Sequence, residues 1–315
     1  LIQGVAMSLR FIQTALFSVV IFSSCAYSLV IPSPLVSADW LSENLDQVVV
    51  LDVRKDLASF SEQGHIPNAN LVNTKKVRVT RIIDGVELTR MRPDQANFER
   101  FMSAHGVSND TIVVVTHQGR TPGDVAGAAR LYWQMKYYGF EQVALLDGGN
   151  AAWTESMEEL TTNSSEIIPG RLANLSSTNE KILATIEQVK LAITSQAVQL
   201  VDTRSLRFHV GLDSRKYVYD LGHIPTSKVF PYKFLHPGKG VMSFPNKQQI
   251  KSRFEALNID PNAQIILYCN SAYECSSVWF SLHEIFGNHQ VRVYDGSLHQ
   301  WTKDATNPMT INLAK

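Results

Sequence analysis

The hydrophobic residues of this chain gather in short continuous runs, with helical stretches between them. We read the runs as strands buried on both faces, because a half-exposed strand would alternate apolar and polar positions. The runs lie at residues 48–54, 111–115, 143–146, 198–204, 264–268 and 291–294. Helical stretches lie around 126–138 and 276–286, and Thr185 with Gln188 is typical of a capping box that opens another helix. The pattern predicts an α/β fold with parallel sheets that carry helices on both faces.

The pattern occurs twice, at an offset of about 150 residues. Three motifs mark both copies: Asp-x-Arg at 52–54 and 202–204, Gly-His-Ile-Pro at 64–67 and 222–225, and Asp-Gly with a later Trp at 147–153 and 295–301. An offset of this size is that of a domain rather than of a solenoid repeat. We therefore predict two domains, at 35–155 and 181–308, joined by a polar linker at 156–180.

The first 28 residues have a different pattern. Met7 and Arg10 precede an apolar stretch at residues 11–22, and small residues follow it. A short basic region before a short apolar core is typical of a secretory signal, and the stretch is too short for a membrane span. We expect residues 1–28 to be a signal peptide with an upstream extension, and the mature protein to be periplasmic or secreted. Cys25 lies in a loose lipid-acceptor motif, so the alternative is a lipoprotein; without lipid there, we expect no stable membrane association.

Composition adds several exclusions. The 29 basic and 29 acidic residues are interspersed and give a net charge of zero, so we expect no nucleic-acid partner. Two of the three cysteines, Cys269 and Cys275, lie close together, which is not the pattern of a disulfide framework. No His and Cys spacing matches a zinc site, and we expect neither a metal nor a cofactor.

Cys269 is the strongest candidate for chemistry. It stands where a buried strand ends and a helix begins, and parallel sheets bind ligands beyond the carboxyl ends of their strands. Backbone N–H groups in such a loop favour a thiolate over a thiol. We predict that this thiolate attacks a sulfur donor and that the loop cradles the resulting persulfide. The cradle residues are Asn270, Ser271, Ala272, Tyr273 and Glu274. The alternative is a small buried apolar residue, which is common for free cysteines.

Together these motifs resemble the rhodanese family, which includes thiosulfate and 3-mercaptopyruvate sulfurtransferases. The resemblance covers residues 35–301, with both repeats in order. It implies tandem α/β domains and transfer of sulfur from a small-molecule donor to a small-molecule acceptor through a cysteine persulfide. We align Thr116 of the first copy with Cys269, so we expect the first domain to be catalytically silent. We expect its neighbours His117 and Arg120 to be solvated loop residues.

The loop at 269–274 departs from both standard forms of the family. Thiosulfate-type loops resemble Cys-Arg-Lys-Gly-Val-Thr and mercaptopyruvate-type loops resemble Cys-Gly-Ser-Gly-Val-Thr, whereas this chain has Cys-Asn-Ser-Ala-Tyr-Glu. Ser271 agrees with the mercaptopyruvate form. An ionised Glu274 would repel both the thiolate and an anionic donor. Either Glu274 points to solvent, or the enzyme prefers a donor that neither standard loop serves.

Three arginines could bind the negative charge of a donor. Arg204 matches the family's Asp-x-Arg position, Arg207 resembles a second substrate arginine at a spacing one residue short, and Arg215 precedes the second Gly-His-Ile-Pro. Arginine suits bidentate capture of a carboxylate or sulfonate. The alternative roles are an ion pair of Arg204 with Asp202 or Asp295, and a surface charge for Arg215.

Cys275 has two possible roles. In the simpler one it packs in the first turn of the helix. In the other it is a resolving thiol that converts the Cys269 persulfide into a disulfide and releases sulfide. A phosphatase is excluded, because its Cys-x5-Arg loop needs an arginine where Cys275 stands. The remaining rival to an enzyme is a binding module that carries sulfur or senses redox state without turnover.

Overall fold

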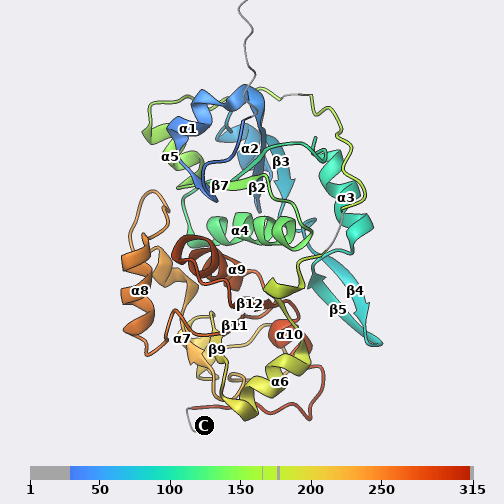
Figure 1. Cartoon of the computed structure of the whole chain (residues 1–315), viewed down its shortest axis with the longest axis vertical. Helices are drawn as coiled ribbons and strands as arrows, with labels where there is room; N and C mark the ends of the chain where they lie inside the picture. The colour runs from blue at the N-terminus through green and yellow to red at the C-terminus, as the bar shows by residue number, and fades with distance from the viewer. Residues whose placement is uncertain (1–28, 165, 176–177, 313–315) are drawn as a thin grey trace, which may run out of the picture.

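The computed structural model describes residues 29–164, 166–175 and 178–312, which form two α/β domains, one above the other in Figure 1. The signal peptide predicted at residues 1–28, and the alternative of a lipid attached to Cys25, lie outside the described residues. In the part of the chain that is described, no helix has the length and apolar character needed to cross a membrane.

Each domain is built on a parallel sheet, and the two sheets have equivalent strand orders, β1-β7-β6-β2-β3 and β8-β12-β11-β9-β10. The first sheet contains β1 (Leu35–Val36), β2 (Val49–Arg54), β3 (Asn70–Asn73), β6 (Val113–Thr116) and β7 (Val143–Leu146). The second contains β8 (Leu183–Ala184), β9 (Gln199–Asp202), β10 (Lys228–Val229), β11 (Ile265–Tyr268) and β12 (Val291–Tyr294). The predicted fold class, two α/β domains that are each built on a parallel sheet, is thus confirmed.

Helices cover the sheets, as the buried strand runs require. Those of the first domain are α1 (Ala38–Glu43), η1 (Leu45–Gln47), α2 (Ala58–Glu62), α3 (Gln95–Ala104), α4 (Pro122–Tyr137) and α5 (Gly149–Glu155). Those of the second are η2 (Glu180–Ile182), α6 (Ile186–Ser195), α7 (Leu206–His209), η3 (Tyr232–Leu235), α8 (Lys247–Glu255), α9 (Glu274–Phe280), the π-helix η4 (Ser281–Phe286) and α10 (Ser297–Trp301). The predicted capping box of Thr185 and Gln188 opens α6.

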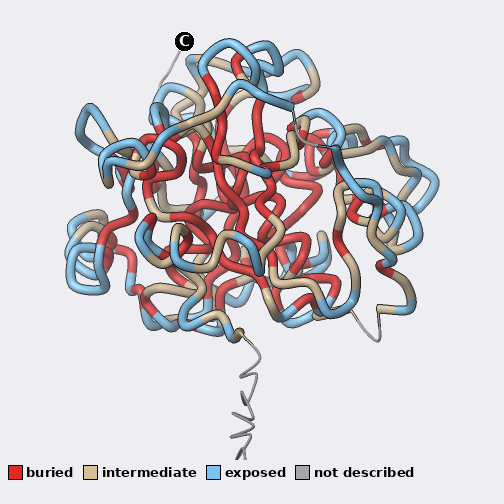
Figure 2. Tube along the Cα trace, turned by 90° about the horizontal axis from the view of Figure 1, so that it is seen from above, coloured by how far each residue is buried: buried red, intermediate tan, exposed pale blue. Residues whose placement is uncertain are grey.

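The domains meet at α4 and α9, which lie against each other at the centre of the molecule (Figure 1). Tyr132 of α4 packs edge-on against Phe280 of α9, with ring centroids 4.9 Å apart. Arg130, fully buried in α4, forms an ion pair with Asp295 of the second domain at 2.5 Å. The buried segments lie in the middle of the molecule in Figure 2, and one cluster of buried apolar residues has members from both domains. This shared apolar core fixes the position of each domain against the other.

A β-hairpin of the first domain was not predicted. Its strands are β4 (Val79–Ile83) and β5 (Val86–Met91), joined by Asp84 and Gly85 in the left-handed conformation. Asp-Gly between two apolar runs is a strong hairpin signal, so the sequence could have revealed it. The hairpin reaches towards α10 of the second domain (Figure 1), where the Thr89 N–H donates to Nε2 of His299 at 3.1 Å.

The described residues of the predicted linker pack along the first domain. Leu172 is buried, and the N–H of Gly170 donates to the carbonyl oxygen of Ser103 in α3 at 2.8 Å. The linker therefore lies against α3 and does not separate the domains.

Candidate active site

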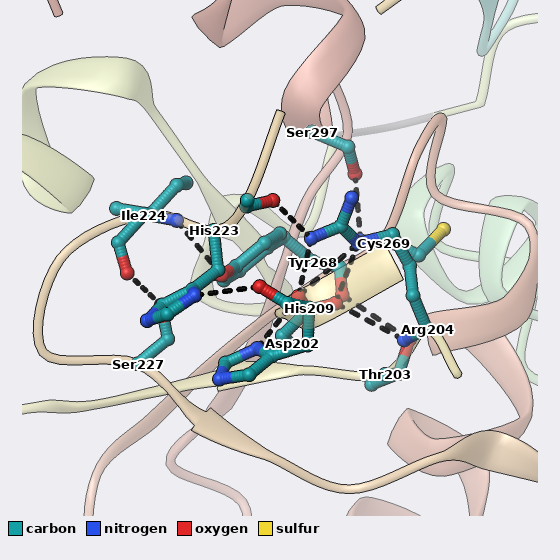
Figure 3. Close-up of polar contacts among 11 residues, drawn as sticks. Asp202, Thr203, Arg204, His209, His223, Ile224, Ser227, Tyr268, Cys269 and Ser297 are labelled. Atoms are coloured by element: carbon teal, nitrogen blue, oxygen red, sulfur yellow. Dashed lines mark hydrogen bonds and ion pairs between the residues drawn. The ribbon is translucent and has the colours of Figure 1, made fainter. Parts of the chain in front are cut away.

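A buried ion pair at the end of β9 fixes the Gly-His-Ile-Pro turn. Arg204 binds Asp202 at 2.6 Å and donates to the carbonyl oxygen of Gly222 at 2.7 Å. Burial alone would raise the pKa of Asp202, but Arg204 and His209 lower it to about 2. In Figure 3 the Arg204 guanidinium is bonded within this cluster, and none of the drawn hydrogen bonds ends on the sulfur of Cys269. The arrangement favours the ion-pair role of Arg204 over substrate binding.

The first domain contains the same arrangement. Arg54 binds Asp52 at 2.7 Å and donates to the carbonyl oxygen of Gly64, also at 2.7 Å. The first domain has no cysteine in its loop, yet its Asp-Arg pair has the same partners. The pair therefore stabilises the fold and is not specific to the reaction. The histidines of both turns are structural as well: His65 stacks on Phe60 with ring centroids 3.7 Å apart.

The loop after β11 converges on the sulfur of Cys269. Burial alone would raise the pKa of this thiol. Hydrogen bonds from the Cys275 side chain and from the backbone N–H groups of Cys275, Ser271 and Glu274 outweigh burial and lower the pKa from 9.0 to about 6. The side chain is 1% exposed and lies at the wall of a cavity. At neutral pH the arrangement therefore holds a thiolate next to a space that a ligand can enter.

Ser297, which sequence reasoning missed, holds this loop in place. Its hydroxyl accepts hydrogen bonds from the N–H groups of Cys269 at 3.2 Å and Ala272 at 3.1 Å, and donates to the carbonyl oxygen of Tyr294 at 2.9 Å. Its backbone is left-handed, with φ 49°, as is that of Gly149 at the equivalent place in the first domain. The replacement of Gly149 by a serine in the second copy of the Asp-Gly motif was the available signal.

The cavity beside Cys269 lies between the domains and has a volume of about 470 Å³. The second domain contributes Cys269 and loop residues 270, 271, 273 and 274, with Arg215, Tyr217 and Tyr232. The first contributes Val53, Lys55, Thr74, Lys75, Arg78, Arg90, Thr121, Gly123 and Asp124. Four of the five cationic side chains in the lining come from the first domain, and only two acidic side chains oppose the five. The cavity therefore attracts anions.

Two of these cations are held by aromatic rings of the second domain. The guanidinium of Arg78 lies 4.6 Å from the ring centroid of Tyr273, and that of Arg90 lies 4.4 Å from the ring centroid of Tyr217. Cation–π contacts of this kind fix the positions of charged groups at a cavity wall. No motif in the sequence marks either arginine, because their partners belong to the other domain.

The three predicted substrate arginines lie in different places. Arg215 is exposed and lines the cavity, with its guanidinium 5.1 Å from the ring centroid of Phe208. Arg207 is also exposed but pairs with Asp213 at 2.8 Å and does not line the cavity. Arg204 is buried in its ion pair. Of these three arginines, only Arg215 lines the cavity beside Cys269, whereas the buried Arg204 interacts with Cys269 through its charge alone.

Glu274 does not point away into solvent. It lines the cavity, and its Oε2 atom is buried with no hydrogen-bond partner among the described residues. Burial raises the pKa of this carboxyl to about 8, and the neighbouring Cys269 contributes to the rise while Arg215 opposes it. At neutral pH most of the Glu274 side chains are therefore uncharged, which removes the repulsion that the sequence suggested.

Cys275 is fully buried and directly adjacent to the site. Both Cys269 and Cys275 are free cysteines. Burial raises the pKa of Cys275 well above its ordinary value, and the hydrogen bond to Cys269 raises it further. Cys275 therefore remains a thiol at neutral pH and donates its proton to the Cys269 sulfur.

The first-domain loop differs from the predicted alignment. The strand register places Thr116 opposite Asp52, as Tyr268 is opposite Asp202, so His117 is the counterpart of Cys269. The prediction that Thr116 occupies this position is wrong, because β6 continues to Thr116, one residue beyond the apolar run at 111–115. His117 was also expected in solvent, yet it is fully buried. Burial lowers the pKa of His117 to about 3.

Metal binding has no support in the described residues, where no three His, Cys, Asp or Glu side chains are grouped so that they could hold an ion.

Comparison with known proteins agrees with this fold and site. The family model of the rhodanese-like domain matches residues 37–156 and 185–304, so the chain belongs to the rhodanese-like family, with two such domains in tandem. The sulfur carrier protein TtuD of Thermus thermophilus is 30% identical over 284 residues, which is 86% of this chain and 94% of that protein. The thiosulfate sulfurtransferase of Cricetulus griseus is 26% identical over 296 residues, 89% of this chain and 96% of its own length.

The fold is also that of a solved structure. The 3-mercaptopyruvate sulfotransferase SseA of Escherichia coli superposes with a TM-score of 0.69 and 23% identity, covering 84% of this chain and 98% of that one. At this identity the likeness concerns the fold alone.

Proposed function

We propose that this protein is a sulfurtransferase in which Cys269 takes sulfur from a small anionic donor and passes it to a thiophilic acceptor as a persulfide. The observation that carries the proposal is the convergence of three backbone N–H groups and one thiol on the sulfur of Cys269, at the wall of a cationic cavity. A buried structural cysteine would need neither the hydrogen bonds nor the open space.

The geometry supports a two-step transfer. The thiolate of Cys269 attacks the sulfur of the donor, a new S–S bond forms, and the donor fragment leaves with the electrons of its bond to sulfur. The loop N–H groups then hold the negative persulfide. In the second step the acceptor attacks the outer sulfur and Cys269 leaves as the thiolate. Arg215 and Arg78, on opposite domains, would hold the donor's charge.

The second candidate is a protein that carries sulfur, or senses redox state, without turnover. It is favoured by the name of one relative, a sulfur carrier protein. Both candidates form the persulfide, so they differ only in whether a small acceptor discharges it repeatedly.

The test is to incubate reduced protein with thiosulfate or with 3-mercaptopyruvate and measure the mass of the peptide that contains Cys269. An added sulfur on that peptide supports both candidates; its absence with both donors rejects both. Cyanide is then added, and the number of thiocyanate ions formed per protein molecule is measured. Many thiocyanates per enzyme support the transferase, and no more than one supports the carrier. Cys269→Ser is the control.

Cys275 enters the proposal as a hydrogen-bond donor rather than as a resolving thiol, because its pKa is raised and thiols attack as thiolates. We expect Cys275→Ala to retain most of the transfer activity, with only a small loss at pH 7 because the pKa of Cys269 rises. The measurement is thiocyanate production. Sulfide released by the wild type without added thiol, and abolished by Cys275→Ala, would instead establish the resolving role.

We propose further that the protein is exported, because the pattern of residues 1–28 is that of a signal peptide. N-terminal sequencing of protein recovered from the cell envelope tests cleavage. Labelling with a fatty acid, compared between the wild type and Cys25→Ser, tests the lipoprotein alternative.

A further inference from the structure

The carboxyl group of Glu274 occupies an unusual position for an acid. It shares the cavity wall with Cys269, and its backbone N–H donates to the Cys269 sulfur, so the carboxyl belongs to a residue that already contacts the reacting atom. Its Oε2 atom is buried and has no hydrogen-bond partner among the described residues. A buried polar atom without a partner is costly, and such atoms in native structures call for an explanation.

The groups around Glu274 decide its charge. Those that interact with it within the second domain are Cys269, Arg215, Asp202, Arg204, Tyr232 and Tyr273. From the first domain, Arg78, Lys75 and Asp124 line the same cavity. None of these groups forms an ion pair or a hydrogen bond with the carboxyl. It is therefore available as a proton donor to a molecule in the cavity.

We propose that Glu274 relays a proton during the removal of sulfur from the donor. This relay adapts the site to a β-mercapto-α-keto acid, the class that contains 3-mercaptopyruvate. The inference rests on the proposed function, since it concerns the step in which Cys269 acquires sulfur.

The step balances without any further reactant. The thiolate of Cys269 attacks the donor's thiol sulfur, the S–S bond forms, and the C–S bond breaks with its electron pair going to the methylene carbon as an enolate. Neutral Glu274 protonates that carbon and gives the keto acid with a methyl group. The resulting carboxylate of Glu274 then accepts the proton of the Cys269 persulfide. The carbon thus gains the proton of Glu274, the donor's thiol proton replaces it on the carboxyl group, and the enzyme retains a persulfide anion and a neutral Glu274.

A donor such as thiosulfate needs no such relay. Attack of the thiolate on its outer sulfur releases sulfite, a stable anion that leaves without a proton. General acid catalysis contributes only where a proton moves in the rate-limiting step. The two donors therefore separate the role of Glu274 from the role of Cys269.

The experiment compares wild type with Glu274→Gln, which keeps the size and polarity of the side chain but has no acidic proton. We expect kcat with 3-mercaptopyruvate to fall by about 100-fold with little change in KM, and the rate with thiosulfate to change by about threefold at most. With 3-mercaptopyruvate, the wild-type rate should fall as pH rises through about 8, where Glu274 loses its proton, and Glu274→Gln should lack this decline. Glu274→Asp should recover part of the activity.

Controls keep the result interpretable. Glu255→Gln alters an exposed glutamate of the same domain and should change neither rate. Alkylation of Cys269 by iodoacetamide reports whether Glu274→Gln still has a formed loop. An equal loss with both donors, or a gain with 3-mercaptopyruvate, would overturn the relay while leaving the persulfide mechanism in place. Failure of the wild type to form a persulfide with either donor would overturn the proposed function itself.

Discussion

The loops after β6 and β11 have the same place in their domains and the same length, but among the described residues only the second has its first residue at the wall of a cavity. In the second domain the loop begins with Cys269 and faces the cationic cavity. In the first domain the equivalent residue is His117, and a second-domain segment covers the loop: the Met242 N–H donates to the carbonyl oxygen of Gly119 at 3.1 Å. The covering segment also donates from the Phe244 N–H to Asp147 at 2.8 Å.

This comparison separates architecture from chemistry. The Asp-Arg pair and the Gly-His-Ile-Pro turn are alike in both domains, so they build the fold. The differences are in the loop and in what covers it. The hairpin β4–β5 and the segment before it place Arg78 and Arg90 at the open site, whereas the segment that covers the first site brings backbone groups and the side chains of Val241, Ser243 and His236. The domain without the nucleophile thus contributes most of the cavity's positive charge.

The largest expected effect comes from exchanging the nucleophile. Cys269→Ser should lower sulfur transfer by about 10³-fold or more, because a hydroxyl cannot carry the persulfide. The reciprocal change, His117→Cys, should create no activity, since residue 117 is fully buried and the small cavity beside its loop is lined by Gln118 and Arg120 instead. Thiocyanate production measures both. Persulfide on residue 117 of the second variant would show that the cover opens in solution.

Acid should destabilise the protein through His117. The pKa of this buried imidazole is about 3 in the folded chain and about 6.5 in the unfolded chain, so the unfolded state binds more protons between these values. Stability is therefore full above pH 6.5 and falls as pH drops towards 3, by several kcal/mol, on the order of 1.4 kcal/mol per unit of pKa difference. Urea unfolding at pH 7 and pH 4.5 should show a smaller loss for His117→Gln. His236, whose pKa is lowered to about 4, contributes in the same range in both proteins. Equal losses would contradict this assignment.

The left-handed position after Asp-Gly should tolerate no exchange of its residue in either domain. Ser297→Gly removes the hydroxyl that serves the Cys269 loop and should cost about 1–3 kcal/mol, and Ser297→Ala about 1 kcal/mol more because alanine disfavours this backbone. Gly149→Ser should cost more still, since a Cβ there would lie 2.3 Å from the carbonyl oxygen of His117. Urea midpoints measure all three. Full stability of Gly149→Ser would show that the loop can shift.

The smallest effect concerns the single left-handed residue of each loop, Gly119 in the first and Ala272 in the second. Ala272→Gly should relieve backbone strain while increasing the freedom of the unfolded chain, for a net change of no more than about 1 kcal/mol. The pKa of Cys269 should not change, because the backbone path is retained. The rate of Cys269 alkylation by iodoacetamide, measured across pH, checks that the pKa is unchanged. A pH midpoint of alkylation that differs from about 6 would show that Ala272 also affects the pKa of Cys269.

The sequence by itself determined the two domains, their parallel sheets and the position of Cys269, because each depends on local signals. Buried strands are visible as apolar runs, and the repeat of Asp-x-Arg and Gly-His-Ile-Pro reveals the duplication. The expected lowering of the Cys269 pKa also followed from one local feature, a loop at the start of a helix.

Only the tertiary structure decided what surrounds that sulfur. Contacts between residues far apart in the chain decide the surroundings of Arg204, the burial of Glu274 and the positions of the first-domain arginines. Burial in turn sets the charge of Glu274, which no sequence pattern reveals. Strand register likewise corrected the alignment of His117 with Cys269, because a shift of one residue is invisible in apolar runs but changes which residues lie opposite each other.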